Sequence, residues 1–316
     1  MKNTNKPGIL NLSSIILIIF ILGIVNGCKK KAPQEKETFK VVFLTDIHLQ
    51  PELNAVNGLS LALDSVNAIK PDFIITGGDL IMDALGATYG RADSLYNLYN
   101  ETIKKAGCPV YNTIGNHDIY GILEGSGADP EGEEYGELMF EKRFGKSYYA
   151  FEHKGWKFFI INSIEDTGES GYKGYIDAGQ VKWIREELKK TDQSTPLVIS
   201  THIPFITAFT QKYQGSTVPN SAGIVVENSK EILDLFKNHK LKLVLQGHLH
   251  AIEDIDIDGI HFITGGAVCG RWWKGPNRTY EEGFVSLVFG KDDFSWRYVD
   301  YGWEVGQEPV LSVYKP

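Results

Sequence analysis

The hydrophobic pattern of the chain alternates between short apolar runs and longer segments with helical spacing. Runs rich in β-branched and aromatic residues, typical of buried strands, cover residues 39–45, 72–76, 110–114, 148–151, 157–161, 196–200 and 242–245. Segments with apolar residues three and four positions apart predict amphipathic helices over residues 53–69, 91–106, 179–190 and 229–240. Further strand-like runs follow at residues 255–257, 260–264, 284–289 and 294–301. Strands and helices that alternate in this way predict an α/β layered fold.

Three segments lack clear periodicity and read as long loops. The first of them is rich in Gly and Glu and predicts a short helix near Gly136–Arg143. Loops of this length are uncommon unless they are functional or mobile. We therefore expect them to form the rim of a pocket, and they cover residues 120–145, 205–226 and 269–282. The sequence contains no internal repeat and no sign of a second domain.

The N-terminus has the features of an export signal. Lys2 and Lys6 provide a basic start, and residues 13–25 form a short apolar core. A basic start, a short apolar core and a small residue before the cleavage site define a signal peptide. The Gly27-Cys28 pair that follows resembles the lipoprotein box of exported bacterial proteins.

This resemblance implies that residues 1–27 are a lipoprotein signal peptide and that Cys28 is lipidated. Residues 28–38 are polar and predict a tether, which leaves residues 39–316 as the domain. The protein is then an exported, membrane-anchored lipoprotein that faces the periplasm or the cell exterior. An uncleaved membrane helix is the alternative, although the apolar run is shorter than the ~20 residues that a spanning helix needs.

Composition and charge narrow the range of partners. The chain has 316 residues and a formal net charge of −8, so no nucleic-acid groove is expected. A small phosphorylated substrate remains compatible, because bound metal ions would reverse the local charge. After Cys28 only Cys108 and Cys269 remain, which excludes a thiolate zinc site. Whether these two cysteines form a disulfide, and the oligomeric state, stay open.

Candidate chemistry first appears after the predicted strand at residues 110–114, in the motif Gly115-Asn116-His117-Asp118. The Gly allows a sharp turn, and the Asn offers a carbonyl oxygen to a metal. The His can give or take a proton near neutral pH, and the Asp can orient its ring. An ordinary polar turn explains this motif equally well if it stands alone.

Other predicted strands end in matching groups. In α/β folds, ligands gather beyond the carboxyl ends of the strands. Here those ends also carry Asp46, His48, Asp79, His202, His248 and His250. His248 and His250 are alternate residues, so their side chains point to the same side of an extended segment. Each motif has an ordinary structural explanation, but recurrence at five successive strand ends predicts one shared site.

The candidate ligands are two carboxylates, one amide oxygen and four imidazoles, without sulfur. They are Asp46, His48, Asp79, Asn116, His202, His248 and His250. A mixed nitrogen and oxygen set suits Mn, Fe, Zn, Ni or Co, whereas Mg or Ca sites are richer in oxygen. Seven ligands are too many for one tetrahedral ion, and they fit two divalent transition metal ions if one carboxylate bridges them.

In this order the five motifs resemble the signature of the calcineurin-like metallophosphoesterase superfamily, over about residues 39–265. The resemblance implies a four-layer α/β/β/α sandwich of two mixed β-sheets flanked by helices. It implies one metal ion held by Asp46, His48, Asp79 and His250. It implies a second ion held by Asp79, Asn116, His202 and His248. It also implies a metal-dependent hydrolase of phosphate mono- or diesters, with a water activated by both ions and His117 as the general acid.

The sequence leaves alternatives open for both the subfamily and the activity. Purple acid phosphatases of this superfamily have a Tyr three residues after the bridging Asp, and many of its cyclic-nucleotide phosphodiesterases have an Asp there. This chain has Met82 at that position and Asp83 one residue later, so neither assignment follows. A non-catalytic binding or scaffold lipoprotein on the same fold is the alternative function, although such proteins typically lose ligands or the catalytic His. A further alternative is a membrane-tethered structural lipoprotein in which the His cluster holds a structural metal.

Candidate substrate-binding residues, apart from the metal ligands, lie in the loop after residue 268. Arg271 can clamp a phosphate, and Trp272 can stack on a base or a sugar. The competing explanation is that Trp272 and Trp273 pack against the last strands. The sequence alone does not separate monoesters from diesters.

Overall fold

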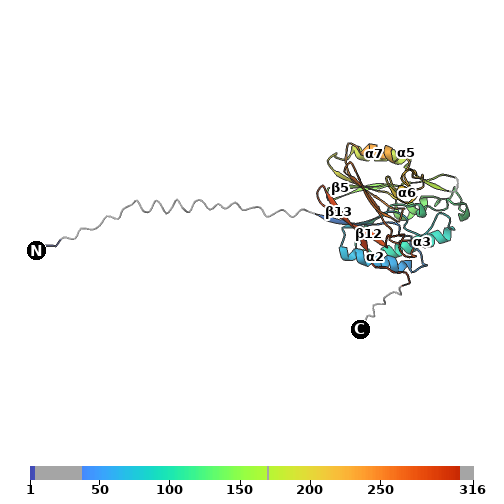
Figure 1. Ribbon diagram of the computed structural model, residues 1–316, viewed down its shortest axis with the longest axis horizontal. Helices are drawn as coiled ribbons and strands as arrows, with labels where there is room; N and C mark the ends of the chain where they lie inside the picture. The colour runs from blue at the N-terminus through green and yellow to red at the C-terminus, as the bar shows by residue number, and fades with distance from the viewer. Residues whose placement is uncertain (4–37, 169–170, 307–316) are drawn as a thin grey trace, which may run out of the picture. The chain divides into compact units, whose positions relative to one another are not determined.

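Two β-sheets form the body of the chain in this computed structural model, which describes residues 1–3, 38–168 and 171–306 (Figure 1). The first sheet has the strand order β13-β12-β1-β2-β3. Its strands are β1 (Phe39–Leu44), β2 (Phe73–Thr76), β3 (Val110–Tyr111), β12 (Gly283–Phe289) and β13 (Phe294–Asp300). β1, β2 and β3 run parallel, and β12 is antiparallel to both of its neighbours. The carboxyl ends of the three parallel strands therefore share one edge.

The second sheet has the strand order β10-β11-β9-β8-β5-β4. Its strands are β4 (Tyr149–His153), β5 (Trp156–Ile160), β8 (Pro196–Ser200), β9 (Lys240–Gln246), β10 (Ile252–Ile257) and β11 (Ile260–Gly265). The four central strands are parallel, and the edge strands β10 and β4 are antiparallel to them. The sheet is thus mixed, as predicted.

Alternate residues of β1 belong to two different cores. Val41 and Phe43 pack in a cluster that also contains Phe158 and Val198 of the second sheet. Val42 and Leu44 pack instead in the larger cluster, which includes residues of the helices. Because successive side chains of a strand point to opposite faces, one run of apolar residues fills both the space between the sheets and the space under the helices.

Helices cover the outer face of each sheet. In Figure 1, α2 (Ala55–Ile69) and α3 (Tyr89–Ile103) lie on one side of the strands, and α5 (Ala178–Lys189) and α7 (Ser229–Phe236) lie on the other. On α7 the contact is aromatic, with the rings of Phe236 and Phe159 of β5 at 5.3 Å. The predicted four-layer α/β/β/α sandwich is confirmed.

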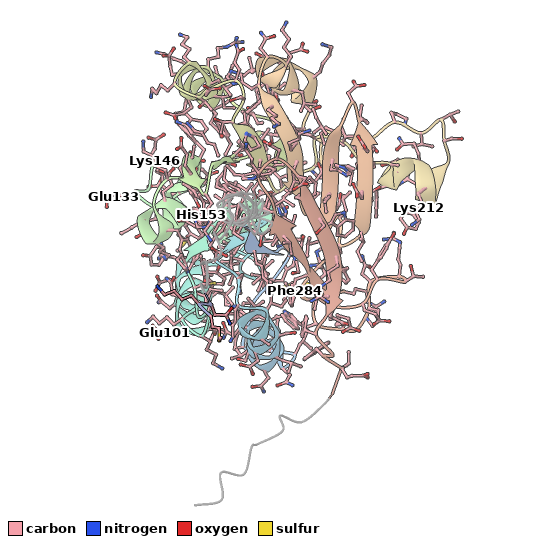
Figure 2. The ribbon with its side chains drawn as sticks, turned by 90° about the vertical axis from the view of Figure 1, so that its left-hand side faces the viewer. Glu101, Glu133, Lys146, His153, Lys212 and Phe284 are labelled. Atoms are coloured by element: carbon pink, nitrogen blue, oxygen red, sulfur yellow. The ribbon has the colours of Figure 1, made fainter. Side chains whose placement is uncertain are left out.

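The structure departs from the predicted elements in the irregular parts. The long loop contains α4 (Leu138–Phe144) as expected, but the expected polar loop after residue 205 contains α6 (Phe209–Gln214). Figure 2 shows α6, with Lys212, at the edge of the body. A two-stranded sheet of β6 (Ile164–Asp166) and β7 (Tyr172–Gly174) was not predicted. β3 ends three residues early, because the Thr113 amide donates to the side-chain hydroxyl of Thr76 in β2, at 3.0 Å, and not to a backbone carbonyl of that strand.

The cysteines and the N-terminus complete the comparison with the prediction. Cys108 is half-buried and Cys269 is buried, and both are free thiols, so the disulfide left open by the sequence is absent. Cys28 and nearly all of the predicted signal peptide and tether lie outside the described residues. Among the residues that are described, no helix is long and apolar enough to cross a membrane.

Candidate metal centre

The loops after five parallel strands meet at one place, and they bring all seven predicted ligands together. β1 and β2 lead into Asp46 and Asp79, and β8 and β9 of the other sheet lead into His202 and His248. The two sheets contribute comparable parts because their parallel strands end at the same side of the sandwich. The site is buried, with Asp46 and His202 at 0% exposure and Asp79 at 2%.

A first group of ligand atoms surrounds one point. Nε2 of His48 lies 3.1 Å from Nε2 of His250 and 3.4 Å from Oδ2 of Asp79. Nε2 of His250 lies 3.3 Å from Oδ1 of Asp46. Ligand atoms that share one ion at about 2.0–2.2 Å lie roughly 3 Å from one another. These four side chains therefore have the spacing of a single coordination shell.

A second group lies on the other side of Asp79. Its Oδ2 is 3.2 Å from Nε2 of His202, and that nitrogen is 3.0 Å from Oδ1 of Asn116. A nitrogen of His248 also lies within 4.8 Å of the Asp79 and His202 ligand atoms. The same carboxylate oxygen, Oδ2 of Asp79, thus borders both groups.

The histidine rings are oriented by backbone carbonyls. Nδ1 of His202 donates to the Gly77 carbonyl at 2.7 Å, and Nδ1 of His250 donates to the Gly270 carbonyl at 2.5 Å. The ring of His248 is reversed, since its Nε2 donates to the Gly223 carbonyl at 2.7 Å. A ring that donates from one nitrogen presents a lone pair on the other. In its neutral form, each of these rings therefore presents an acceptor nitrogen to the centre of the site.

The electrostatics of the site call for positive charge. Burial opposes ionisation of Asp79, but His202 and His117 hold its pKa well below the usual range. Burial alone would lower the pKa of His202, yet Asp79 and Asp46 raise it to about 9. Burial, aided by the neighbouring His202, lowers the pKa of His248 to about 4. Buried carboxylates with few cationic partners form a place where a divalent cation replaces protons.

Two positions beside the ligands must be glycine, because neighbouring atoms leave no room for a side chain. A Cβ at Gly115 would lie 2.2 Å from the backbone nitrogen of Asp79. A Cβ at Gly247 would lie 2.0 Å from Oγ1 of Thr45 and 2.8 Å from Oδ2 of Asp46. Gly115 itself is extended, with φ −115° and ψ 178°, and the predicted tight turn follows it at Asn116–Asp118, where the Asp118 amide donates to the Gly115 carbonyl at 3.2 Å. The Gly is needed because any side chain would displace a ligand.

His117 borders the site without the partner that the sequence suggested. Its ring lies 4.7 Å from the ring of His48, and its side chain is 24% exposed. Asp118 is buried and accepts hydrogen bonds from the backbone amides of Leu80 and Gly115, so it fixes the loops and does not orient the His117 ring. The carboxylate near that ring is Asp83, whose Oδ1 is 3.8 Å from Nδ1.

The two tryptophans after residue 271 have different environments. Trp273 is buried, and its Nε1 donates to the carbonyls of Ile47 and His48, both at 3.0 Å. It packs on α2 and not, as the alternative proposed, on the last strands alone. Trp272 is 39% exposed, and its ring lies 5.0 Å from that of His250. A cavity of about 530 Å³ adjoins this face and is also lined by Arg271.

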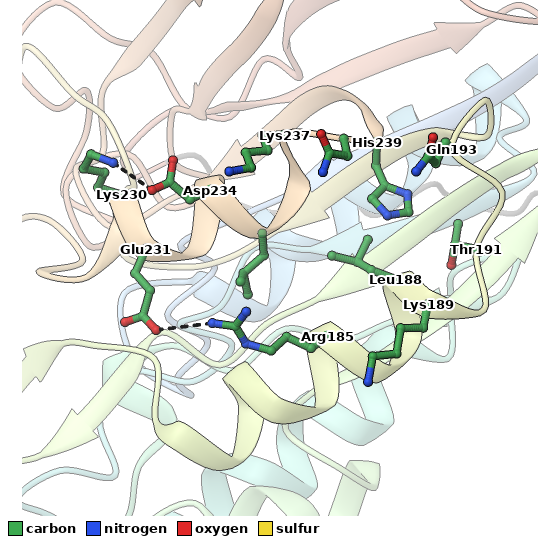
Figure 3. A pocket seen from close by; sticks show the side chains of 12 residues that line it. Arg185, Leu188, Lys189, Thr191, Gln193, Lys230, Glu231, Asp234, Lys237 and His239 are labelled. Atoms are coloured by element: carbon green, nitrogen blue, oxygen red, sulfur yellow. Dashed lines mark hydrogen bonds and ion pairs between the residues drawn. The ribbon is translucent and has the colours of Figure 1, made fainter.

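A larger cavity of about 880 Å³ lies between α5 and α7 (Figure 3). None of the predicted site residues lines it. Two ion pairs border it, since Arg185 lies 3.9 Å from Glu231 and Lys230 lies 2.7 Å from Asp234, and Lys189 and Lys237 line it as well. Among the described residues, none of the clusters that could hold a metal ion lies in this cavity, so it offers no chemistry comparable to that of the metal centre.

Some functional groups had no signal in the sequence. The carbonyls of Gly77, Gly223 and Gly270 orient the ligand rings, but every residue carries a carbonyl. Arg278 lines the same cavity as Arg271 and was not singled out. The sequence could have indicated Arg278, because it lies within residues 269–282, a loop that was expected at the pocket rim.

Comparison with known proteins agrees with this geometry. The family model for calcineurin-like phosphoesterases matches residues 39–251, and the chain belongs to this family. The predicted class of enzyme, a metallophosphoesterase, is confirmed.

Two relatives illustrate the match at low identity. A 3',5'-cyclic-nucleotide phosphodiesterase of Nostoc is 24% identical over 250 residues, which cover 74% of this chain and 80% of the relative. A probable cyclic nucleotide phosphodiesterase of Fibrobacter succinogenes is 22% identical over 230 residues, with 71% and 77% covered. The crystal structure of a dimetal phosphatase from Danio rerio superposes with a TM-score of 0.56 at 13% identity, covering 84% of this chain and 99% of that one. That superposition supports the fold.

Proposed function

We propose that this protein hydrolyses phosphate mono- or diesters with two divalent transition metal ions (Mn, Fe, Zn, Ni or Co). One observation carries the proposal: Oδ2 of Asp79 lies 3.4 Å from the ligand nitrogen of His48 and 3.2 Å from that of His202. A single carboxylate oxygen between two groups of ligands is the arrangement that a bridged pair of ions requires. The proposed ligands are Asp46, His48, Asp79, Asn116, His202, His248 and His250.

The residues present fit such a pair. The facing nitrogens of His48 and His250 are 3.1 Å apart, so one donates a proton to the other unless a cation takes the place of that proton. The second ring nitrogen of His250 is committed to a carbonyl. The donor set contains no thiolate, which suits the proposed metals. Two bound ions would acidify a water molecule and offset the negative charge of the phosphate oxygens.

The chain's own acid is His117. Its backbone amide donates to Oδ1 of Asp79 at 2.8 Å, which fixes the residue beside the proposed bridge. Asp83 lies on the Nδ1 side of the ring and leaves Nε2 for the departing oxygen. Donation of a proton to that oxygen is general acid catalysis, typically worth about 10²–10⁴-fold in rate.

The scaffold alternative is less well supported, because the chain keeps all seven ligands and His117 together. The names of the Nostoc and Fibrobacter relatives support a diester substrate, while the site itself accommodates either ester.

For localisation we propose an exported lipoprotein anchored through Cys28, on the basis of the N-terminal sequence.

The leaving group tests the role of His117. His117→Ala should keep two metal ions per chain and lose roughly 10²–10⁴-fold in kcat on an alkyl phosphate ester. The loss should be much smaller with a p-nitrophenyl ester, because nitrophenolate departs without a proton. Asp83→Asn should show the same dependence with a smaller loss. Equal losses on both esters would refute the acid, and failure of metal-loaded wild type to hydrolyse any phosphoester would refute the proposed function.

A further inference from the structure

The cavity beside the metal centre is larger than a phosphate group requires. It measures about 530 Å³ and is bordered by His248 and His250 on its inner side. Sites for small organic molecules typically measure about 300–1,000 Å³. A phosphate held at the proposed ligands would leave most of this space for the remainder of the substrate.

Two arginines at this cavity have no acidic partner. Arg271 and Arg278 line it, and among the described residues Arg271 contacts the Lys274 carbonyl and Arg278 contacts aromatic rings, while neither forms an ion pair with a carboxylate. By contrast, Arg91, Arg143 and Arg185 each lie near a carboxylate elsewhere in the fold. In a chain with a net charge of −8, two unpaired guanidinium groups at one cavity favour an anionic ligand.

Arg278 is held in position by aromatic rings. Its guanidinium carbon lies 4.3 Å from the ring centroid of Tyr213 and 5.1 Å from that of Phe209, both on α6. Lys212 of the same helix donates to the Tyr280 hydroxyl at 2.7 Å, which ties α6 to the turn that carries Arg278. Figure 2 shows Lys212 on this peripheral helix. A guanidinium stacked on a ring keeps its N–H donors free at the edge.

Trp272 supplies the flat surface of the cavity. Its ring lies 5.0 Å from the ring of His250 and 6.2 Å from that of His48. The side chain is 39% exposed, so its indole presents an aromatic face on which a planar ring can stack. An exposed indole next to two arginines suits a planar ring that carries negative charge.

We propose that this cavity binds a leaving group with a planar ring and a second anionic group. The ring stacks on Trp272, and the second anion, a carboxylate or a phosphate, binds Arg271 and Arg278. This inference rests on the proposed function, which places the scissile phosphate at the metal ligands. It narrows the predicted substrates to phosphoesters whose ring carries the scissile phosphate on one side and a second anionic group on the other.

Phosphonates test the proposal without catalysis, since their P–C bond is not hydrolysed. The probes are (4-carboxybenzyl)phosphonate, its uncharged carboxamide and 1,4-xylylene bisphosphonate, titrated calorimetrically into full-length protein loaded with Mn²⁺. At least one of the two doubly anionic probes should bind tenfold or more tightly than the carboxamide. The tighter of the two identifies the second anion as a carboxylate or a phosphate.

Arginine variants assign the effect to the cavity. Arg271→Gln and Arg278→Gln should each reduce the preference for the second anion by about 10-fold or more, the range of a charge-assisted hydrogen bond. The affinity for the carboxamide should stay unchanged. Arg297→Gln is the matched control, because Arg297 is also an exposed arginine without an ion pair but lies on β13 and lines no cavity described. Trp272→Ala should weaken all three probes alike, at unchanged metal content.

Equal affinity for all three probes, or a preference that persists in the double arginine variant, would overturn the proposal. These outcomes are separate from the proposed function. An enzyme that hydrolyses phosphoesters but shows no preference for a second anion refutes this inference alone. A preference that holds in a protein without phosphoesterase activity refutes the proposed function and leaves the anion site standing.

Discussion

The contact between Gly58 of α2 and the indole of Trp273 links the fold to the site, and Gly58→Ala tests it. A Cβ at Gly58 would lie 2.1 Å from Cζ3 of Trp273, with two more ring atoms at 2.8 and 2.9 Å. The indole is 1% exposed and cannot move outward without losing its burial. Its Nε1 donates to the carbonyls of Ile47 and His48. Displacement of the ring therefore reaches the loop that carries a proposed metal ligand.

The magnitude follows from opposing effects. Ala is a better helix former than Gly by about 0.5–1 kcal/mol. Overpacking a filled core costs about 1–3 kcal/mol, and a buried indole N–H left without an acceptor costs about 1–3 kcal/mol more. We expect Gly58→Ala to lower the free energy of unfolding by roughly 1–5 kcal/mol, which for a domain of this size lowers Tm by about 2–4 °C per kcal/mol. Metal affinity should fall as well, because the His48 loop shifts.

Thermal unfolding with and without metal measures both effects. Gly90→Ala is the matched control, because Gly90 is also helical, in α3, and a Cβ there would meet nothing within 4 Å. That variant should be neutral or slightly stabilised. A smaller side chain at Trp273, such as Leu, should reduce the cost of Gly58→Ala, since the two residues are in contact. If Gly58→Ala proves as stable as Gly90→Ala, the packing described here is wrong.

Three further predictions concern metal, acid and anchoring. Asp79→Ala should lower bound metal, measured by elemental analysis, further than any other single ligand change, and retention of two ions would contradict a bridge. Burial opposes ionisation of Glu134, but Lys142 and Arg143 lower its pKa from 4.5 to about 2, so its contribution to stability is complete above about pH 4.5 and is lost as the pH falls toward 2. Glu134→Gln should therefore lower the Tm of metal-free protein more at pH 6 than at pH 3, and an equal gap at both values would contradict the pairing. Cys28→Ser should release the protein from membranes or block its processing, and a variant that remains membrane-bound at wild-type size would indicate an uncleaved helix.

The sequence predicted those elements whose pattern is local and repeated. β1 and α2 were found within two residues, because each carries one uninterrupted periodicity. β6 and β7 have three residues each, too few to show alternation, and they exist because they pair with each other. α6 has six residues and no strong pattern. Short elements of this kind depend on tertiary contacts that no local window contains.

The candidate site was predictable to the level of residue type but not of geometry. The seven predicted ligands come together in the structure because each follows a recognisable strand, such as His202 after β8. The pairing of His117 with Asp83 was missed, since Asp118 is closer in sequence and only the fold shows that its carboxylate faces backbone amides. Arg278 was missed for a related reason, because its relevance depends on α6.

Backbone conformation shows what the fold contributes to the site before any metal binds. Left-handed φ values occur at five proposed ligands, namely Asp46 (54°), His48 (45°), Asp79 (52°), His248 (72°) and His250 (47°). Non-glycine residues in this region cost on the order of 1 kcal/mol each, so together they cost a sizeable part of the ~5–15 kcal/mol that stabilises a typical domain. The strain persists because the surrounding structure holds it.

The way this strain is held explains how the site is prepared for cations. The amide of His248, for example, donates to both oxygens of Asp46 at 3.0 Å. The same loops hold the ring nitrogens of His48 and His250 3.1 Å apart, the distance of a hydrogen bond through one proton. A bound cation would take the place of that proton while the backbone stays as it is. Metal should therefore bind the folded chain far more tightly than the unfolded one, and saturating Mn²⁺ should raise Tm by linkage.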